Sequence, residues 1–255
     1  MTQAEPNVYV YGVLRAADAG AVSVAGVEDR EVRAVKEGDL AALVSDLEAG
    51  ELKAAKEVRA HWRVLEEASA KATVLPIRFG TVMAGDGSVR AQLLEPNAER
   101  LSGLLSELAG RVQLTVKGEY DEKLLLREVV EKSPQIGTLR ERVQELPEAA
   151  GYYERIRLGE LVASEVERRR EQDVALAVDR LEPLAVGVRV EPPASAESAF
   201  NLAFLVERDR IDPFGAAVAK LGKEAGERIH IRFVGPLPPY SFADANLSAE
   251  GSAWA

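Results

Sequence analysis

The alternating segment Lys71–Met83, KATVLPIRFGTVM, constrains the fold more than any other part of the chain. As a β-strand it places Leu75, Ile77 and Phe79 on one face, opposite Val74, Pro76 and Arg78. A second Ile-Arg-Phe sequence lies near the other end, where Ile229, Ile231 and Phe233 alternate with His230 and Arg232. Each copy follows an amphipathic helical pattern. The sequence therefore predicts two α+β units, each with an arginine-bearing strand packed under a helix.

The composition indicates an acidic globular protein with an aliphatic core. Hydrophobic residues make up 47% of the chain but aromatic residues only 5%, so aliphatic side chains must fill the core. The formal net charge is −10, and the sequence pI is about 5.0. Because phosphate contacts require clustered lysine and arginine, this charge argues against binding to nucleic acid and to anionic membrane surfaces.

The chain contains no cysteine, which excludes disulfides, thiolate metal sites, iron–sulfur clusters and thiol nucleophiles. Its first residues, MTQAEPNVYVYG, have neither the basic segment nor the apolar segment of a signal peptide. No apolar run approaches the roughly 20 residues that span a bilayer. We expect a soluble, cytoplasmic protein.

Residues 1–118 are predicted to form a ferredoxin-like α+β domain with one or two extra strands. Strands are expected at 7–14, 31–35, 39–45 and 111–117, in addition to the segment described above. In the first of them Tyr9, Tyr11 and Val13 should share a face. Helices are expected at 51–72, from Ser88 to Leu94, and again after Pro96-Asn97, with a turn at residues 84–87.

Residues 119–182 are predicted to form a helical connector. Asp121 should cap its first helix, Ser133-Pro134 should begin its second, and a long charged helix should run from about 148 to 181. Residues 183–255 are predicted to form a C-terminal α+β unit with a smaller sheet. Its expected elements are strands at 184–190 and 200–206, a helix after Asp212-Pro213, the second Ile-Arg-Phe strand and a proline-rich aromatic tail.

The sequence shows no catalytic or metal-binding constellation. His61 and His230 are the only histidines, neither belongs to an HxH or HExxH motif, and both are interpreted as structural or surface residues. The nucleophile-elbow, dinucleotide-binding and P-loop motifs are absent. Glutamates flank the arginines at 168–170, which predicts a locally neutralised helix face. We therefore expect no catalytic residue, metal or cofactor.

Four side chains have two open interpretations. Arg78 and Arg232 lie between apolar neighbours on their strands, so each is either half of a structural ion pair or an anchor on a binding face. Tyr240 and Phe242 follow three closely spaced prolines that enforce an extended path. These two aromatic residues either pack back over the sheet or dock onto a partner.

Four segments together resemble the gas vesicle protein GvpL/GvpF family. They are NVYVYGV, ATVLPIRFGTVM, VKGEYDEKLL and IRFVGPLPPYSF, and they occur in the family's order along nearly the whole chain. PIRFGT and GPLPPYSF are the most specific. The resemblance implies a modified ferredoxin-like N-terminal domain and a C-terminal α+β domain. It also implies a non-enzymatic accessory protein of gas vesicles, the protein-walled organelles that give buoyancy.

The resemblance further implies partners and a location. Family members are thought to bind the hydrophobic vesicle wall protein and other accessory proteins early in assembly, and some associate with the vesicle. The partner surface is predicted to include Arg78, Phe79, Arg232, Tyr240 and Phe242. One alternative is a ferredoxin-like regulatory module that binds a small anion through Arg78 and Arg232. A hydrolase that uses a carboxylate pair is a third hypothesis.

Overall fold

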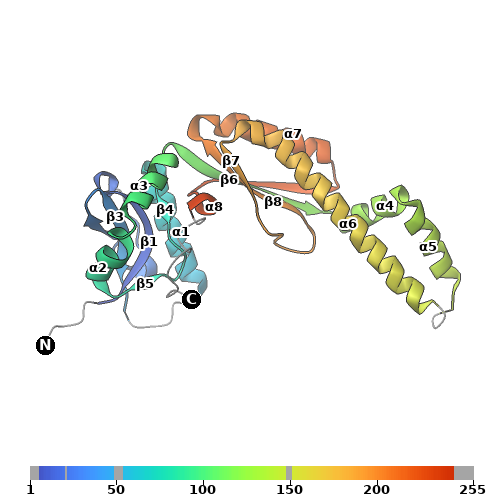
Figure 1. Ribbon diagram of the computed structural model, residues 1–255, viewed down its shortest axis with the longest axis horizontal. Helices are drawn as coiled ribbons and strands as arrows, with labels where there is room; N and C mark the ends of the chain where they lie inside the picture. The colour runs from blue at the N-terminus through green and yellow to red at the C-terminus, as the bar shows by residue number, and fades with distance from the viewer. Residues whose placement is uncertain (1–5, 21, 49–53, 148–150, 244–255) are drawn as a thin grey trace. The chain divides into compact units, whose positions relative to one another are not determined.

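The computed structural model describes residues 6–20, 22–48, 54–147 and 151–243 (Figure 1). The chain forms two compact units. The first combines residues 1–113 with 235–255, and the second contains residues 114–234. Each unit joins helices to an antiparallel sheet, so the α+β class predicted from the sequence is confirmed. The predicted segments 1–118, 119–182 and 183–255 are consecutive, whereas the structure groups the end of the chain with its beginning.

The first sheet is built around β1 (Val8–Arg15). Its other strands are β2 (Arg33–Glu37), β3 (Leu40–Asp46), β4 (Leu75–Pro76) and β5 (Val82–Met83). The order is β2-β3-β1-β4, and β5 also pairs with β1. Six consecutive residues of β3 are buried, so both of its faces are covered. The ferredoxin-like description of this unit stays a prediction.

The single strand expected at residues 71–83 is interrupted. Only two short pieces pair with β1, because the chain turns at Gly80, whose φ of +89° is a conformation that side-chain-bearing residues rarely adopt. Strict alternation also fails, since Val74 and Pro76 are as buried as Leu75 and Ile77. Arg78 and Phe79 therefore lie in a loop between β4 and β5 rather than within a strand.

A β-bulge changes the face assignment in β1. Val10 pairs with Val44 and Gly12 with Leu43, so Tyr11 is the extra residue. The bulge reverses the alternation after Tyr11. Leu14, and not Val13 as predicted, therefore joins Tyr9 and Tyr11 in one core cluster. A Cβ at position 12 would lie 2.8 Å from the Leu75 carbonyl oxygen, so this close approach of strands requires glycine.

The helices of the first unit are α1 (Ala54–Lys71), α2 (Gly85–Ser88), α3 (Ala98–Glu107) and α8 (Tyr240–Ala243). The unit also contains η1 (Ala16–Asp18) and η2 (Val27–Asp29), both between β1 and β2, and the π-helical η3 (Val89–Leu94) between α2 and α3. Residues 84–87 are predicted as a turn, but α2 begins at Gly85, with Ala84 as its N-cap. The φ of +78° at Gly85 turns the chain into this helix. The Ser88 hydroxyl does not cap a helix; it donates to the Ala84 carbonyl at 2.9 Å.

The second sheet contains β6 (Arg111–Tyr120), β7 (Gly187–Val190), β8 (Ser198–Glu207) and β9 (Ile229–Leu237), in the order β7-β8-β6-β9. Sequence patterning predicts that residues 111–117 complete the first sheet, but β6 lies between β8 and β9 instead. Residues 112–116 are all buried. A strand buried on both faces suits this central position better than an edge.

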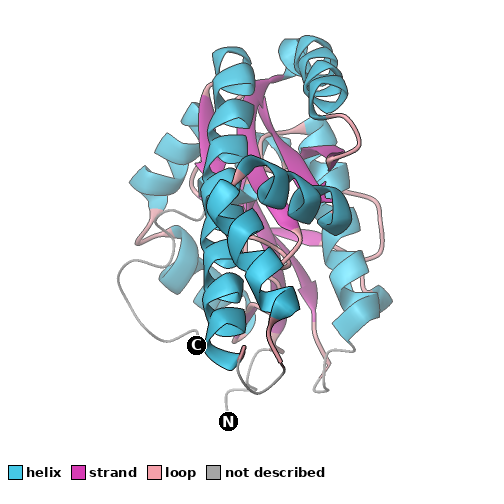
Figure 2. Ribbon diagram, turned by 90° about the vertical axis from the view of Figure 1, so that its right-hand side faces the viewer, coloured by secondary structure: helices cyan, strands magenta, loops and turns pink. Residues whose placement is uncertain are grey.

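The helices of the second unit are α4 (Glu122–Lys132), α5 (Pro134–Glu145), α6 (Tyr152–Leu181) and α7 (Ile211–Ala225), with short η4 (Glu182–Leu184) and η5 (Arg208–Arg210). The Asp121 carboxylate accepts the Leu124 N–H at 2.9 Å, which confirms the predicted cap. Ser133 makes no such bond. Residues 148–150, where the long helix is expected to begin, lie outside the described residues. Helices α4 and α5 pack against α6, and α6 and α7 lie on the same face of the second sheet (Figures 1 and 2).

Candidate partner-binding residues and two buried polar networks

An aromatic cluster of buried and half-buried residues surrounds His61 in the first unit. It comprises Tyr9, Tyr11, His61, Phe79 and Tyr240, and is called the His61 cluster here. The Tyr9 hydroxyl lies 3.0 Å from His61 Nδ1, and the Tyr240 hydroxyl lies 2.7 Å from His61 Nε2. The imidazole stacks on Tyr11 and meets the Phe79 ring edge-on at 5.7 Å between centroids. Two of the five predicted partner residues, Phe79 and Tyr240, thus belong to one cluster.

Backbone and hydroxyl groups satisfy the two buried tyrosines. The Gly80 N–H donates to the Tyr9 hydroxyl at 3.0 Å, and the Val27 N–H donates to the Tyr11 hydroxyl at 2.7 Å. The Tyr11 hydroxyl also lies 2.7 Å from Ser45 Oγ. Because a buried polar group without a partner is costly, these bonds hold the loops around residues 27 and 80 against the sheet.

The His61 cluster is uncharged at neutral pH. Burial lowers the pKa of His61 to about 4, and burial raises the pKa values of Tyr9 and Tyr11. A neutral imidazole has one donor and one acceptor nitrogen, which matches its two hydroxyl partners. His61 is only 1% exposed, and both ring nitrogens are bonded within the protein. This geometry suits a structural tie better than proton transfer to a substrate.

The remaining predicted partner residues are distributed over both units. Arg78 is exposed in the β4–β5 loop, and Phe242 is half-buried in α8 beside Tyr240. Arg232 is exposed on β9 and belongs to the second unit. Among the described residues, neither arginine forms a salt bridge, so the structural ion pair considered for each is not found there. Tyr240 takes the packed orientation, since its ring lies 4.9 Å from that of Trp62 on α1.

The second unit buries a different kind of polar group. The Arg228 guanidinium donates to both carboxylate oxygens of Asp173 at 2.6 Å, and the Tyr120 hydroxyl donates to the same carboxylate at 2.7 Å. The Glu128 carboxylate lies 2.7 Å from Arg169 Nη1 and 3.5 Å from Arg228 Nε. Asp173 and Arg169 lie on α6, and Glu128 lies on α4. These five residues, called the Asp173 network, therefore join α6 to α4, β6 and the start of β9.

Opposite charges stabilise each other within the Asp173 network. The bond to Asp173 raises the pKa of Arg228. Burial alone would raise the pKa of Glu128, but Lys132, Arg228 and Arg169 outweigh burial and hold that pKa below its ordinary value. Burial, followed by the bond to Asp173, raises the pKa of Tyr120. Both carboxylates and both guanidiniums are paired, which is the arrangement expected of a structural network.

The three consecutive arginines of α6 all have partners within the chain. Arg168 pairs with Glu165, and Arg169 belongs to the Asp173 network. Arg170 donates to the backbone carbonyl oxygens of Ser198 and Ala196 at 2.9 and 3.0 Å. These guanidiniums therefore hold β8 and α4 to α6 and do not form a free basic patch.

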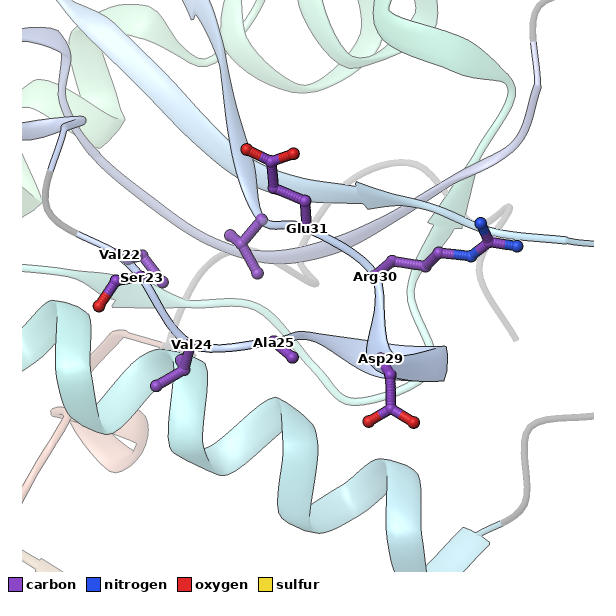
Figure 3. Close-up of a pocket in the computed structure, with 8 residues that line it drawn as sticks. Val22, Ser23, Val24, Ala25, Asp29, Arg30 and Glu31 are labelled. Atoms are coloured by element: carbon purple, nitrogen blue, oxygen red, sulfur yellow. The ribbon is translucent and has the colours of Figure 1, made fainter.

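A cavity of about 290 Å³ lies beside residues 22–32 of the first unit (Figure 3). Val24 and Asp29 point toward α1, whereas Arg30 and Glu31 point away from it. Asp29 pairs with Lys56 at 2.7 Å, and Arg30 pairs with Glu48. Ligand sites require polar groups that converge on one point. The charges here diverge, and Asp29 and Arg30 are paired, so this cavity does not form an anion site; neither Arg78 nor Arg232 lines it.

Glu67 of α1 anchors the start of this segment. Its carboxylate accepts the backbone N–H groups of Ser23 and Val24, both at 3.1 Å, and the Ser23 hydroxyl at 2.9 Å. The hydrogen bond from Lys71, followed by that from Ser23, lowers the pKa of Glu67 to about 2. The carboxylate is therefore occupied by its own chain.

The second unit has an apolar groove between α6 and the edge of its sheet. This β7 groove measures about 250 Å³. It is lined by Glu167, Arg170, Glu171, Val174, Val190, Glu191, Pro193, Ala199, Phe200 and Asn201. Val186 and Val190 beside it are 46% and 60% exposed. Sequence reasoning missed this groove, although alternating valines at 186, 188 and 190 were a signal for an exposed strand.

A second exposed apolar set lies at the start of α6. Tyr152, Tyr153 and Ile156 are 61%, 79% and 44% exposed.

Among the described residues, no group of three or more histidine, aspartate or glutamate side chains could hold a metal ion. Nor does any helix within the described ranges have the length and apolar character needed to cross a membrane.

Comparison with known proteins gives a consistent result along the chain. The family model "Gas vesicle synthesis protein GvpL/GvpF" matches residues 7–244. Gas vesicle protein F of Streptomyces sp. (strain CB03234) is 37% identical over 244 residues, which cover 93% of this chain and 100% of that relative.

Two solved structures share the fold. The crystal structure of gas vesicle protein GvpF from Anabaena sp. PCC7120 has a TM-score of 0.81 and 28% identity, and covers 94% of this chain and 98% of that one. For GvpF from Microcystis aeruginosa the TM-score is 0.77 and the identity 25%, with 93% and 98% covered. The similarity therefore extends over both units and not only over the short motifs.

Proposed function

Because this chain belongs to the GvpL/GvpF family of gas vesicle synthesis proteins, we propose that it is a non-enzymatic accessory protein that binds the hydrophobic vesicle wall protein. Other accessory proteins would join this complex early in vesicle assembly. The protein would act in the cytoplasm and at the growing vesicle. The family match over residues 7–244 carries the proposal.

The chemistry of the surface supports a binding role. A wall subunit that polymerises through apolar surface needs a partner that covers this surface until assembly begins. A useful partner combines a charged body with a limited apolar contact area. This chain has a net charge of −10, and its second unit exposes the apolar side chains of the β7 groove and of the start of α6.

We assign different tasks to the five predicted partner residues. Arg78 and Arg232 are exposed, and would contact the partner directly. Phe79 and Tyr240 are bonded or packed within the His61 cluster, and would position the loop that carries Arg78 and the adjoining α8. Phe242, in α8, would act with Tyr240.

Co-expression of tagged chain with the wall protein tests the proposal. We expect the wall protein to co-purify with the chain, and Arg78→Glu to reduce the recovered wall protein about 10-fold, since one lost charged contact is worth about 1.4 kcal/mol. Arg59→Glu, the same change at an exposed arginine of α1, is the matched control and should bind normally.

The outcomes separate the function from the surface. Normal binding by Arg78→Glu would remove Arg78 from the partner surface while leaving the function intact. Absence of wall protein from the wild-type sample, together with normal vesicles in cells that lack the gene, would contradict the proposed function itself.

A further inference from the structure

Strand β7 forms an open edge of the second sheet. Among the residues that the structure describes, the sheet order β7-β8-β6-β9 leaves one side of β7 without a neighbouring strand. Gly187 pairs with Leu205 and Arg189 with Ala203, and the Glu191 N–H donates to the Asn201 carbonyl at 2.8 Å. In an antiparallel pair, backbone groups point alternately toward and away from the neighbour. The N–H and C=O groups of Val188 and Val190 therefore point away from β8.

The side chains of these two valines lie on the face that the helices cover. Val188 is opposite Phe204, whose ring contacts Phe214 of α7 at 5.1 Å between centroids. Val190 is two residues further on and shares this face. It borders the β7 groove, where Val174 of α6 and Phe200 of β8 supply further apolar surface. A strand added to β7 would place every second side chain in the groove.

The other edge strand has features that block such an addition. Strand β9 carries the exposed charged or polar side chains of His230 and Arg232, and Pro236, which has no N–H group. Charges and prolines are common protection for sheet edges. On β7 the one charged residue, Arg189, alternates onto the face opposite the groove and makes a long bond, of 3.4 Å, from its Nη1 to the Val188 carbonyl, while Val190 is 60% exposed. The two edges therefore differ in their ability to accept a strand.

The rim of the β7 groove is acidic. Glu167 and Glu171 of α6 and Glu191 after β7 lie along it. The one basic residue of the lining, Arg170, is already bonded to Glu167 and to the Ser198 and Ala196 carbonyl oxygens. Glu171 and Glu191 form no salt bridge with any residue that the structure describes, so the rim is net negative. Charge complementarity favours a partner segment that carries lysine or arginine.

We propose that β7 and its groove bind an extended segment of the wall protein as a fifth strand of the second sheet. The segment has apolar side chains at alternate positions, which enter the groove, and a basic side chain beside Glu171 and Glu191. The backbone of Val188 and Val190 supplies the hydrogen bonds. This inference rests on the proposed function for the identity of the partner, and adds the surface and the mode of recognition.

Val190→Pro tests the inference because it removes an outward N–H donor without removing a bond to β8. Val190→Thr, which keeps the N–H and the shape of the side chain, is the matched control. We expect Val190→Pro to weaken the complex with co-expressed wall protein about 10-fold or more, since the loss of about 1.4 kcal/mol gives a factor of ten. The threonine variant should remain within about 3-fold of wild type.

Hydrogen exchange measured on the wild-type complex provides a second readout. Amides of residues 188 and 190 should exchange about 10-fold more slowly when the wall protein is bound, because they become hydrogen-bonded. If Val190→Pro disturbs exchange in β8, the pair Glu171→Lys and Glu191→Lys replaces it, and should weaken binding by a similar factor.

Each outcome decides between interpretations. A wild-type complex in which residues 188 and 190 stay unprotected, and in which the variants bind normally, overturns this surface but leaves the proposed function. Dimerisation of the chain alone that Val190→Pro abolishes would assign the edge to a second copy, and would also overturn the inference. Failure of the wild-type chain to bind any wall protein overturns the proposed function and this inference with it.

Discussion

Around His61 in the first unit, the buried polar groups are neutral at pH 7, whereas Asp173 and Arg228 in the second unit form a charged pair. The first arrangement ties loops and the chain terminus to a sheet through tyrosine hydroxyls and one imidazole. The second ties the two helices α6 and α4 to β6 and the start of β9 through guanidinium–carboxylate contacts and the Tyr120 hydroxyl. Both give buried polar groups partners within the chain, although Glu128 Oε2 makes no hydrogen bond among the described residues and faces Arg228 Nε only as an ion pair at 3.5 Å. The two arrangements should respond differently to mutation and to pH.

This difference suits the tasks that we propose for the two units. The neutral His61 cluster holds short loops in place and contains no carboxylate that could pair with exposed Arg78. The charged network instead fixes α6, whose outer side borders the β7 groove. The scaffold beside a binding groove should move little, since ordering on binding reduces affinity.

The largest effect is expected from breaking the Asp173 network on one side. Asp173→Ala leaves Arg228 without its bidentate partner and the Tyr120 hydroxyl without its acceptor. We expect a loss of about 3 kcal/mol in the free energy of unfolding, typical of a buried pair that loses one partner. Urea denaturation followed by circular dichroism measures this loss. A loss below about 1 kcal/mol would contradict the assignment of a buried, stabilising pair.

Acidification should affect the two units in different pH ranges. The pKa of His61 is about 4 in the folded protein and 6.5 in the unfolded chain, so below pH 6.5 the unfolded state takes up a proton that the folded state does not. The stability contributed by neutral His61 is therefore complete above pH 6.5. By about pH 4 it falls by about 3 kcal/mol.

Basic neighbours, and not burial, lower the pKa of Glu128, and its contribution to stability is lost in a lower pH range than that of His61. Because its pKa in the folded protein lies below the ordinary 4.5, its contribution is complete above that value and is lost only as the pH falls further. Hydrogen exchange at pH 7 and pH 5 should thus show weakening in the first unit before the second. His61→Gln should flatten the dependence between pH 6.5 and 5, and an unchanged profile would contradict the role of His61.

A smaller effect is expected from Tyr240→Phe. This variant removes the hydroxyl bonded to His61 Nε2 at 2.7 Å but keeps the ring that packs on Trp62. The expected loss is about 1 kcal/mol, with faster hydrogen exchange in α8. Trp62 fluorescence in a Trp254→Phe background reports the same contact. Tyr153→Phe, at a side chain that is 79% exposed, is the control and should change neither readout.

The smallest effect is expected at the surface pair of Arg127 and Glu131. Both side chains are more than half exposed, at 74% and 59%. Arg127→Ala should change the free energy of unfolding by less than about 0.5 kcal/mol, because solvent screens such pairs. Thermal denaturation at low and high salt checks this value. A loss close to that of Asp173→Ala would remove the distinction between buried and exposed charge on which the comparison depends.

Local patterns predicted most of the individual elements. Periodicity located α1, α3, α7 and the long helix α6, and the Asp121 cap gave the start of α4. These features depend on neighbours within a few residues, which the sequence displays directly. The family resemblance likewise depended on continuous segments, and the match over residues 7–244 confirms it.

Features that depend on distant residues were not predictable in this way. The strand at 111–117 looks the same in sequence whichever sheet it joins, and only its partners place β6 in the second sheet. The bulge at Tyr11 arises from the register with β3 and leaves no local mark. Gly80 interrupts the strand at 71–83 because its positive φ turns the chain, after which Thr81 bonds again to β1 through the Val10 N–H.

The candidate site shows the same division. The sequence singled out PIRFGT and the aromatic tail as a predicted partner surface. It did not show that Phe79 and Tyr240 are joined through His61, a residue interpreted from sequence as structural or surface. That interpretation agrees with its burial, but the sequence did not show which residues it joins. The open edge of β7 required the strand order of the second sheet.

The proposed shielding of the wall protein is tested most directly by measuring how much wall protein this chain keeps in solution. Wall protein is expressed with increasing amounts of the chain, and the soluble fraction is quantified after high-speed centrifugation. If the chain shields the wall protein, soluble wall protein should rise in proportion to the chain and saturate at a fixed molar ratio. Wall protein that sediments completely at every ratio, with the chain remaining free in the supernatant, would show that the chain does not shield it.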